Sequence, residues 1–513
     1  MILHAIRAAV LLGGVAAPAA HAQASAQPAL DYGSYGVGFT VIDALDSTRA
    51  FRPHRDFRGR VHEETARPVQ ISVWYPARAA PDAAGMTAGE FRLLSQREVD
   101  FAVTISPADS LRLRLEFIAS AVGFGQSAEV AQQLWDERTR AVAGAQPLPG
   151  PFPVVLYFTA AGASNPLLPE YLASYGFLVA SFPSNGRMTE TSLAFSPNAL
   201  TLDTDVDDAG FVHALLRRLP NADASRLVAA SFSSGSLAAL LWQMRDMQAS
   251  GLVSLEGWER YRAGADLLAP SVHYEPHRVR VPILLIERAP PEASPHYAKV
   301  PDVVDSLRHA RRLRVAFRDA AHADFLSHAP FGSSADHARI YAASARMVRL
   351  FVQSVLENDD AAQRALAELA PPADDPFFTV RRDSGAAPVP TEEELFRLAE
   401  TDTAAAIAAY RDATRLVPGH TLFRESVLTR AAVFARPAVR AAIMQIVVDA
   451  YPRSTAARTT LGTALTEAGR TTEARNVLQA ALTLIDADPA ISEANRDAWR
   501  RRIDQAIARI PPS

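Results

Sequence analysis

A serine-rich junction between a short apolar run and a helical segment carries the clearest chemical signal in the chain. Residues 226–240 read RLVAASFSSGSLAAL, so a predicted strand turns directly into a predicted helix that begins near Gly235. A tight turn between strand and helix exposes a serine hydroxyl at the carboxyl edge of a sheet, an arrangement called a nucleophile elbow. In the pattern G-x-S-x-G, Ser231 replaces the first glycine, Ser233 is the nucleophile and Gly235 is the second glycine.

The same stretch allows a second frame, in which Ser231 is the nucleophile between Ala229 and Ser233. That frame contains neither glycine, although an elbow needs small residues on both sides of its nucleophile. A serine-rich junction without any chemistry is a third interpretation. The missing glycines favour Ser233 over Ser231, and the presence of residues that could activate a serine argues against the third interpretation.

A serine hydroxyl is a weak nucleophile unless an adjacent base takes its proton. In sites of this kind the chain order is serine, acid, histidine, and the histidine lies in a loop after the last strand. Residues 318–326, RDAAHADFL, follow the last predicted strand and place His322 after two alanines. His328 lies beyond that turn and is the weaker candidate, while His213 and His309 fall in helical segments and are expected to be structural. We predict that His322 is the general base.

The third member of such a site is a carboxylate that orients the imidazole and stabilises its protonated form. One position for it follows the strand next but one after the elbow, near Glu287 or Glu292. The other is the end of the very next strand, where Glu256 and Gly257 follow the apolar residues 252–255. A carboxylate at that strand end is placed to reach the histidine, so we predict Glu256 as the acid.

The elements that must hold these side chains alternate along the first two thirds of the chain. Short β-branched or aromatic runs alternate with helical segments, a pattern that predicts a mostly parallel sheet covered on both faces. The eight predicted strands are residues 37–42, 69–75, 154–158, 177–180, 227–230, 252–255, 283–286 and 313–317. The predicted fold class is α/β, with an eight-stranded α/β-hydrolase sheet and flanking helices in a catalytic domain over residues 23–357.

Residues 86–145 interrupt the strand pattern with apolar side chains at helical spacing. They form either a structural insertion or a lid, because insertions at a sheet edge often gate access to a site. This segment and the loop of residues 183–200 are expected to shape the acyl pocket.

A second domain follows the last strand. Residues 358–390 are rich in Ala, Asp and Pro, which is typical of a linker. In residues 391–513, prolines that end helical runs are spaced by 34 (452 − 418) and 37 (489 − 452) residues. A period near 34 is that of tetratricopeptide repeats.

The last of these units places Leu461, Gly462 and Ala474 where two antiparallel helices must approach closely. We predict a tetratricopeptide-like helical domain, with a generic helical bundle as the alternative. In either case a packing module or a contact surface for a protein partner is more plausible than a catalytic role.

The composition excludes several kinds of chemistry. The chain of 513 residues has no cysteine, so disulfides, thiolate metal sites and a cysteine nucleophile are excluded. A net charge of −4 gives no sign of a surface for nucleic acid. No metal or organic cofactor is implied.

The N-terminal residues 1–22 have the three regions of a secretory signal peptide. One positive charge precedes the apolar, small-residue-rich segment 8–20, and Ala20-His21-Ala22 supplies a cleavage site. We therefore expect a periplasmic or secreted protein, cleaved near Ala22, without an integral membrane segment after removal of the signal.

Together, the elbow, acid and histidine resemble the platelet-activating-factor acetylhydrolase group and its dienelactone-hydrolase-like bacterial relatives. Those proteins carry a G-F/H-S-x-G-G elbow, then an L-D-x-W segment, then a histidine near an aromatic residue. The matching residues here are Phe232-Ser233-Ser234-Gly235, Leu255-Glu256-Gly257-Trp258 with the acid 23 residues after the serine (256 − 233), and His322 with Phe325. The resemblance spans roughly residues 32–350.

Two features depart from that family. The acid is Glu rather than Asp, which the fold tolerates. The His-Gly pair that the family carries after the third central strand is replaced by Thr159-Ala160-Ala161-Gly162. That loop should supply one N–H group of the oxyanion hole, from Ala161 or Ala160, and Ser234 the other.

The resemblance implies an ester hydrolase, of the lipase/esterase or acetylhydrolase kind, that uses a Ser-His-Glu triad and an acyl-enzyme on a small-molecule ester or lipid. A peptidase or acyltransferase on the same fold is one alternative. A catalytically inactive hydrolase domain that serves as a binding module beside the helical domain is the other. No residue specifies the ester.

Overall fold

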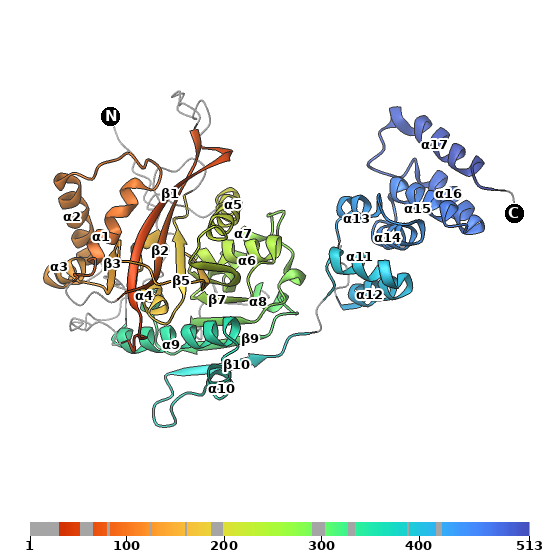
Figure 1. Ribbon diagram of the computed structural model, residues 1–513. Helices are drawn as coiled ribbons and strands as arrows, with labels where there is room; N and C mark the ends of the chain where they lie inside the picture. The colour runs from red at the N-terminus through yellow and green to blue at the C-terminus, as the bar shows by residue number, and fades with distance from the viewer. Residues whose placement is uncertain are drawn as a thin grey trace. The chain divides into compact units, whose positions relative to one another are not determined.

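The computed structural model describes most of the chain, and it divides into two compact units, Met1–Ala386 and Ala387–Ser513 (Figure 1). The described residues are 30–51, 65–78, 83–123, 126–159, 162–185, 199–289, 303–326, 334–386, 389–416 and 423–511. The predicted signal peptide, residues 1–22, lies outside them. Within the described ranges, no helix is both long and apolar enough to cross a bilayer.

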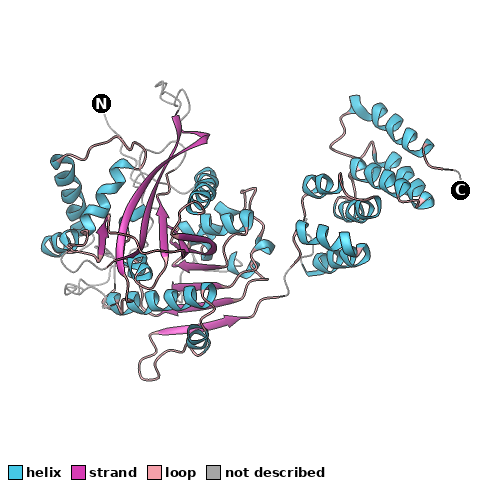
Figure 2. Cartoon of the chain, in the orientation of Figure 1, coloured by secondary structure: helices cyan, strands magenta, loops and turns pink. Residues whose placement is uncertain are grey.

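The first unit is built on a ten-stranded sheet with the order β10-β9-β8-β7-β6-β4-β5-β2-β1-β3 (Figure 2). From β5 to β9 the neighbours are parallel, whereas β2 pairs antiparallel with β1 and β5, and β10 pairs antiparallel with β9. The strands are β1 Gly36–Phe51, β2 Thr65–Ala77, β3 Ala141–Ala143, β4 Phe152–Phe158, β5 Leu178–Phe182, β6 Ala222–Phe232, β7 Gly251–Leu255, β8 Ile283–Arg288, β9 Arg312–Phe317 and β10 Phe378–Asp383.

All eight predicted strands are present, but the sheet is mixed and has two further strands at its edges. The short strand β3 pairs in parallel with the start of β1. The other edge strand, β10, lies in the segment expected to be a linker, together with helix α10, Asp360–Ala367. Its sequence FTVRRD is polar and half exposed, which suits an edge strand. A prediction based on apolar runs therefore misses this strand.

Helices cover both faces of the sheet. The face with Leu227 and Ala229 of β6 packs against α5 and α6, and the face with Val228 and Ala230 packs against α4 and α9. This alternation follows from the period of two along a strand, and burial on both sides is what a parallel sheet requires. The helices of this unit are α1 Ala88–Leu93, α2 Pro107–Gly123, α3 Ala128–Asp136, α4 Leu167–Ala173, α5 Ala199–Leu216, α6 Gly235–Asp246, α7 Arg262–Leu268, α8 Val303–Ser306, α9 His337–Leu356 and α10.

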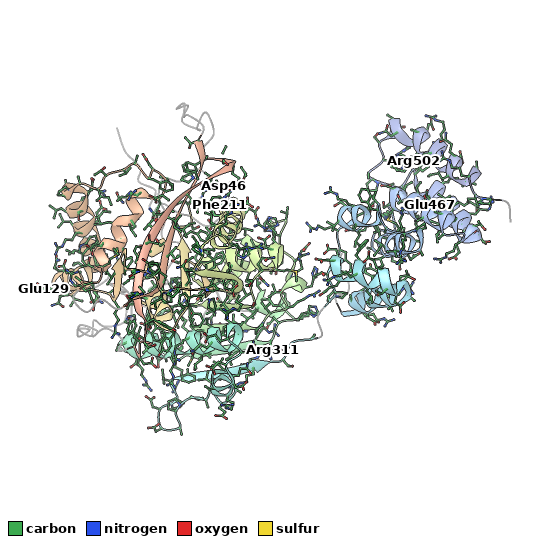
Figure 3. All side chains as sticks on the ribbon, viewed as in Figure 1. Asp46, Glu129, Phe211, Arg311, Glu467 and Arg502 are labelled. Atoms are coloured by element: carbon green, nitrogen blue, oxygen red, sulfur yellow. The ribbon has the colours of Figure 1, made fainter. Side chains whose placement is uncertain are left out.

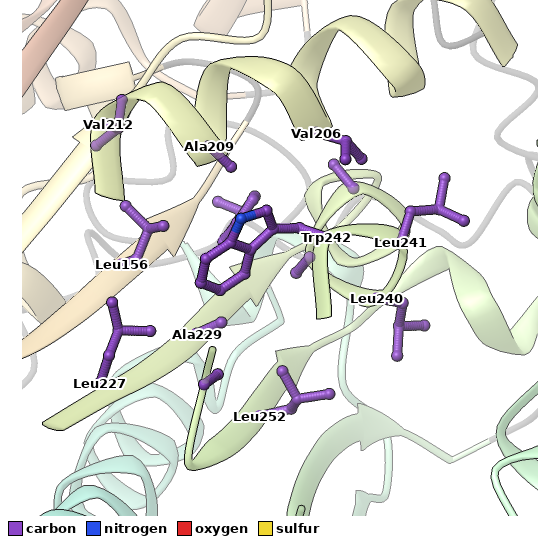
Figure 4. Packing of buried hydrophobic residues seen from close by; sticks show 14 of the residues in the cluster. Leu156, Val206, Ala209, Val212, Leu227, Ala229, Leu240, Leu241, Trp242 and Leu252 are labelled. Carbon is purple, nitrogen blue, oxygen red and sulfur yellow. The ribbon is translucent and has the colours of Figure 1, made fainter. Parts of the chain in front are cut away.

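Trp242 of α6 fixes the helix that follows the predicted elbow. Its side chain is fully buried and lies among Leu156 of β4, Ala229 of β6 and Ala209 of α5 (Figure 4). Burial of so large a side chain is worth roughly 3 kcal/mol. Helix α6 is therefore held firmly against the central strands.

The segment expected as an insertion is anchored to the sheet by its first helix, α1, against which α3 packs. Phe91 of α1 is buried, with its ring centroid 4.9 Å from that of Phe39 and 5.8 Å from that of Trp74. The outer face of α2 is apolar and exposed, because Leu111 and Leu115 are each 56% accessible. Helix α1 therefore belongs to the core of the unit, while α2 carries the exposed apolar face of the segment.

The second unit is helical, with a core of its own. Its helices are α11 Glu392–Thr401, α12 Thr403–Leu416, α13 Glu425–Ala432, α14 Pro437–Ala450, α15 Thr455–Glu467, α16 Thr471–Leu484 and α17 Arg496–Ala508. A Cβ atom on Gly462 would lie 2.4 Å from Leu478 Cγ, so α15 and α16 approach as closely as the sequence predicts. Glu467, labelled in Figure 3, ends α15 and pairs with Arg440 at 2.6 Å. The assignment to tetratricopeptide repeats stays a prediction.

Candidate active site

Ser233 occupies the turn between β6 and α6. Its φ is +55°, a left-handed conformation that a non-glycine residue adopts only when its surroundings impose it. The surroundings here are the end of β7: the Ser233 N–H donates to the Leu255 carbonyl at 3.0 Å, and the Trp258 N–H donates to the Ser233 carbonyl at 3.3 Å. The turn has the strained geometry expected of a nucleophile elbow.

Ser231, the nucleophile of the competing frame, lies inside the sheet. It is 2% exposed, and its hydroxyl donates to the Val253 carbonyl on β7 at 2.9 Å. The missing first glycine is thus replaced by a serine whose polar group is satisfied locally. Ser233 is partly exposed, so the structure places it, and not Ser231, where a substrate could reach.

Gly235 is needed because the elbow passes very close to the neighbouring strand. A Cβ atom at this position would lie 2.4 Å from the Phe158 carbonyl oxygen at the end of β4. Backbone cannot yield to that contact without moving the turn.

We expect Gly235→Ala to lower kcat for a p-nitrophenyl ester by about 100-fold, the loss that a displacement of about 1 Å can cause. Steady-state kinetics will measure it. Gly123→Ala is the control, because a Cβ atom on Gly123 meets nothing within 4 Å. Equal kcat values for the two variants would contradict this account of the elbow.

Glu256 directly follows β7 and is completely buried. Its φ is +47°, and its N–H donates to the Ile286 carbonyl at 2.7 Å. The carboxylate accepts the Tyr261 hydroxyl at 2.6 Å and the Arg288 N–H at 2.8 Å. Two guanidinium groups also reach it, from Arg288 at 2.8 Å and from Arg260 at 3.3 Å.

These contacts keep Glu256 ionised. Burial on its own raises the pKa of a carboxyl group, but here it is outweighed by the facing imidazole of His322, the charge of Arg260 and the Tyr261 hydroxyl. The result is a pKa of about 2 for Glu256. The side chain therefore carries a full negative charge at neutral pH.

His322 begins a 3₁₀ helix, His322–Phe325, just after β9. Its Nδ1 lies 3.7 Å from Glu256 Oε1, and its ring centroid is 5.0 Å from that of Phe232, the neighbour of Ser233. Since Nδ1 faces the carboxylate, Nε2 is the nitrogen left to take a proton from a serine. The structure thus brings together the elbow, His322 and Glu256.

Three of the other candidates for base and acid, Glu287, His213 and His309, fall within the described residues. Glu287 is engaged by Arg260 at 3.5 Å and Arg314 at 3.4 Å. Among the histidines, His213 is buried with its Nε2 at 3.1 Å from the Ala224 carbonyl, in keeping with a structural role. His309 is also buried. Glu292 and His328 lie outside the described residues.

Of the two predicted oxyanion donors, only Ser234 falls in the described part of the chain. It is the N-cap residue of α6, and the first N–H groups of a helix have no partner within the helix and favour negative charge. Ala161 and its alternative Ala160 lie outside the described residues. Directly after them, Gly162 has a φ of +51°, and its carbonyl accepts the Ser181 hydroxyl at 3.2 Å.

The helical insertion reaches this same loop. The Arg92 guanidinium lies 3.5 Å from the Ser164 carbonyl. The buried Glu98 has Oε1 3.6 Å from the place that a Cβ atom on Gly162 would take. These contacts, like those of Arg260, Tyr261 and Arg288 with Glu256, were not predicted. No local sequence motif indicates these contacts. For Arg260 and Tyr261, the closeness to Glu256 along the chain was the only feature from which a contact could have been predicted.

Comparison with known proteins adds little to this picture. No protein-family model matches the chain, and no curated protein matches it. Among solved structures, the chain is similar to a ferulic acid esterase from Streptomyces cinnamoneus, with 18% identity and a TM-score of 0.45 over 69% of this chain and 98% of the esterase. A likeness of that degree says nothing about the substrate. The α/β-hydrolase organisation rests on the chain's own sheet order and elbow.

Proposed function

We propose that this chain hydrolyses carboxylic esters through Ser233, His322 and Glu256. The observation that supports this most strongly is the position of His322, between the buried Glu256 carboxylate and Phe232 of the elbow. A carboxylate, an imidazole and a strained serine in this order form the arrangement that activates a serine for acyl transfer.

In the first step, His322 Nε2 takes the Ser233 proton while Ser233 Oγ attacks the ester carbonyl carbon. The N–H groups of Ser234 and Ala161 (or Ala160) stabilise the oxyanion. The imidazolium then gives its proton to the departing alkoxide. The alcohol is released, and the acyl group stays bound to Ser233 as an acyl-enzyme. Water, deprotonated by His322, then attacks the acyl carbon. The bond to Ser233 Oγ breaks, the acid is released, and the imidazolium returns its proton to Ser233.

Glu256 holds the imidazole with Nε2 toward the serine and stabilises the imidazolium. The separation of 3.7 Å is longer than a hydrogen bond, and such catalytic contacts often tighten only when substrate is bound. Arg260 and Arg288 neutralise part of the charge of Glu256. They therefore moderate the stabilisation that the imidazolium receives.

The direct test is turnover of p-nitrophenyl acetate by the wild-type chain. The proposal expects release of p-nitrophenol above a heat-denatured sample, with a burst if acyl-enzyme accumulates. Esters of increasing chain length will then define the acyl preference. A folded wild type without turnover would contradict the proposal and favour an inactive binding module.

The remaining parts of the proposal follow from the sequence. The predicted signal peptide would place the reaction in the periplasm or outside the cell. The helical unit would then serve as a packing module or as a contact surface for a protein partner. A peptidase or acyltransferase would use the same side chains, so the choice of acyl acceptor and substrate separates these activities.

A further inference from the structure

The loop that carries His322 is tied together by one buried carboxylate. Asp324 is completely buried. Its Oδ2 accepts the Ala321 N–H at 2.7 Å, and its Oδ1 accepts the Ser334 N–H at 2.8 Å. The Nδ1 of His337, the first residue of α9, lies 3.4 Å from the same Oδ1.

We propose that Asp324 is a positioning residue, which fixes the backbone at His322 so that the imidazole stays between Glu256 and the elbow. The inference rests on the proposed function, because it assigns a role in the same site. Asp324 touches neither the ester nor Ser233 in this scheme and acts through the chain segment that begins at Ala321.

His322 needs such support because its side chain is only partly enclosed by the protein. The side chain is 32% exposed, and it lies 3.7 Å from Glu256. Its backbone, by contrast, is held on both sides. Asp324 binds the amide just before it, and the buried Phe325 three residues later packs edge-on against Phe317, with ring centroids 6.0 Å apart.

A carboxylate suits this position better than an amide. Both oxygens of Asp324 accept hydrogen bonds from backbone N–H groups on opposite sides of the loop. An asparagine has one acceptor oxygen and one NH₂ group, so one of the two backbone donors would face another donor. Either orientation of the amide would therefore release one side of the loop.

The charge needed for these bonds is secured locally. Burial raises the pKa of a carboxyl group, but the facing His337 imidazole and the hydrogen bonds from Ser334 and Ala321 outweigh it and hold the pKa of Asp324 below its usual range. Asp324 thus remains ionised at neutral pH, and both oxygens keep their acceptor role.

The test is Asp324→Asn, assayed with p-nitrophenyl acetate. We expect kcat to fall about 10- to 100-fold, because a misplaced general base loses most of its effect, while KM stays within about two-fold because ester contacts are untouched. His337→Phe keeps the ring packing with Tyr341 but removes the ring nitrogen that faces Asp324. This variant should also lower kcat, but by less than Asp324→Asn. It tests the role of Asp324 if Asp324→Asn does not fold.

Glu170→Gln is the matched control. Glu170 is also a completely buried carboxylate, and it accepts the N–H groups of Arg140 and Ala141 at 2.8 and 3.2 Å and the Tyr32 hydroxyl at 2.5 Å. Its variant should lose a comparable set of hydrogen bonds and some stability, but keep the wild-type kcat.

A second readout needs no turnover. Crystal structures of the wild type and of Asp324→Asn, or of His337→Phe, give the separation between His322 Nδ1 and Glu256 Oε1, which should increase in the variants. A wild type without esterase activity would overturn the proposed function, while this distance would still decide the role of Asp324. Unchanged distance and unchanged kcat in a folded variant would overturn the inference.

Discussion

Replacing Ser233 by alanine will lower kcat for p-nitrophenyl acetate by about 10⁶-fold, the size of loss that follows removal of the nucleophile from a catalytic triad. The reason is that neither His322 nor the oxyanion donors can replace the acyl-enzyme step. The fold should survive, since the backbone bonds of Ser233 to Leu255 and Trp258 do not use its side chain. Burst kinetics and a thermal melt, measured on the same preparation, separate loss of chemistry from loss of structure.

Ser231→Ala is the matched control for this prediction. It removes one buried hydrogen bond, to the Val253 carbonyl, so the free energy of unfolding should fall by about 1 kcal/mol. Its kcat should stay within a few-fold of the wild type. If Ser231→Ala abolished turnover and Ser233→Ala did not, the competing frame of the elbow would be correct.

Glu256→Gln will have the second largest effect, and it will act on both catalysis and stability. An amide in place of the triad acid can donate to the imidazole and so favours its wrong tautomer, a loss of about 10⁴-fold in kcat. It also leaves Arg260 and Arg288 without the buried charge that they face, at about 3–5 kcal/mol. Steady-state kinetics and urea unfolding will measure the two losses.

The stability loss should depend on pH with a defined sign. The pKa of Glu256 is lowered to about 2, so its contribution is complete above the ordinary glutamate range and is lost as the pH falls toward about 2. The difference in free energy of unfolding between wild type and Glu256→Gln should therefore shrink in acid. A difference that stayed constant down to pH 3 would contradict the assignment of the low pKa.

Glu287→Gln is the control for the acid. It removes a partner of Arg260 and of Arg314 and should lower the stability while keeping kcat close to the wild type. The opposite pattern, with a large loss of kcat in Glu287→Gln and a small one in Glu256→Gln, would show that the acid follows β8.

The central strands could be predicted from the sequence because they are buried on both faces and therefore consist of apolar residues. In β6, for example, Leu227 and Val228 face opposite layers of helices, so a continuous apolar run results. The edge strands gave no such signal. The polar β10 binds β9 through backbone groups, which any sequence supplies, and the proline-rich flanks of this segment resembled a linker.

The candidate site was predictable for a related reason. Ser233, Glu256 and His322 each follow a strand that the apolar pattern marks, and the ends of parallel strands meet at one edge of the sheet. Their supports were not predictable. Asp324 contacts Ser334 and His337, which follow it only after a further stretch of loop. A contact across such a loop leaves no periodic pattern in the sequence.

The supports of the loop that is proposed to carry an oxyanion donor are equally remote. The replacement of a His-Gly pair by Thr159-Ala160-Ala161-Gly162 was visible in the sequence. The contacts of its end with Ser181 and Glu98 come from a later strand and from the insertion. Only the fold brings these segments together, so their role at the loop could not be read from residue types.

The measurement that tests the central claim most directly is labelling of the wild-type chain with a fluorophosphonate, followed by mass spectrometry of its peptides. A phosphonate reacts with a serine only where a base and an oxyanion hole activate it. We expect one modified residue, Ser233, and no modification in Ser233→Ala. Labelling at Ser231, or no labelling of a folded wild type, would contradict it.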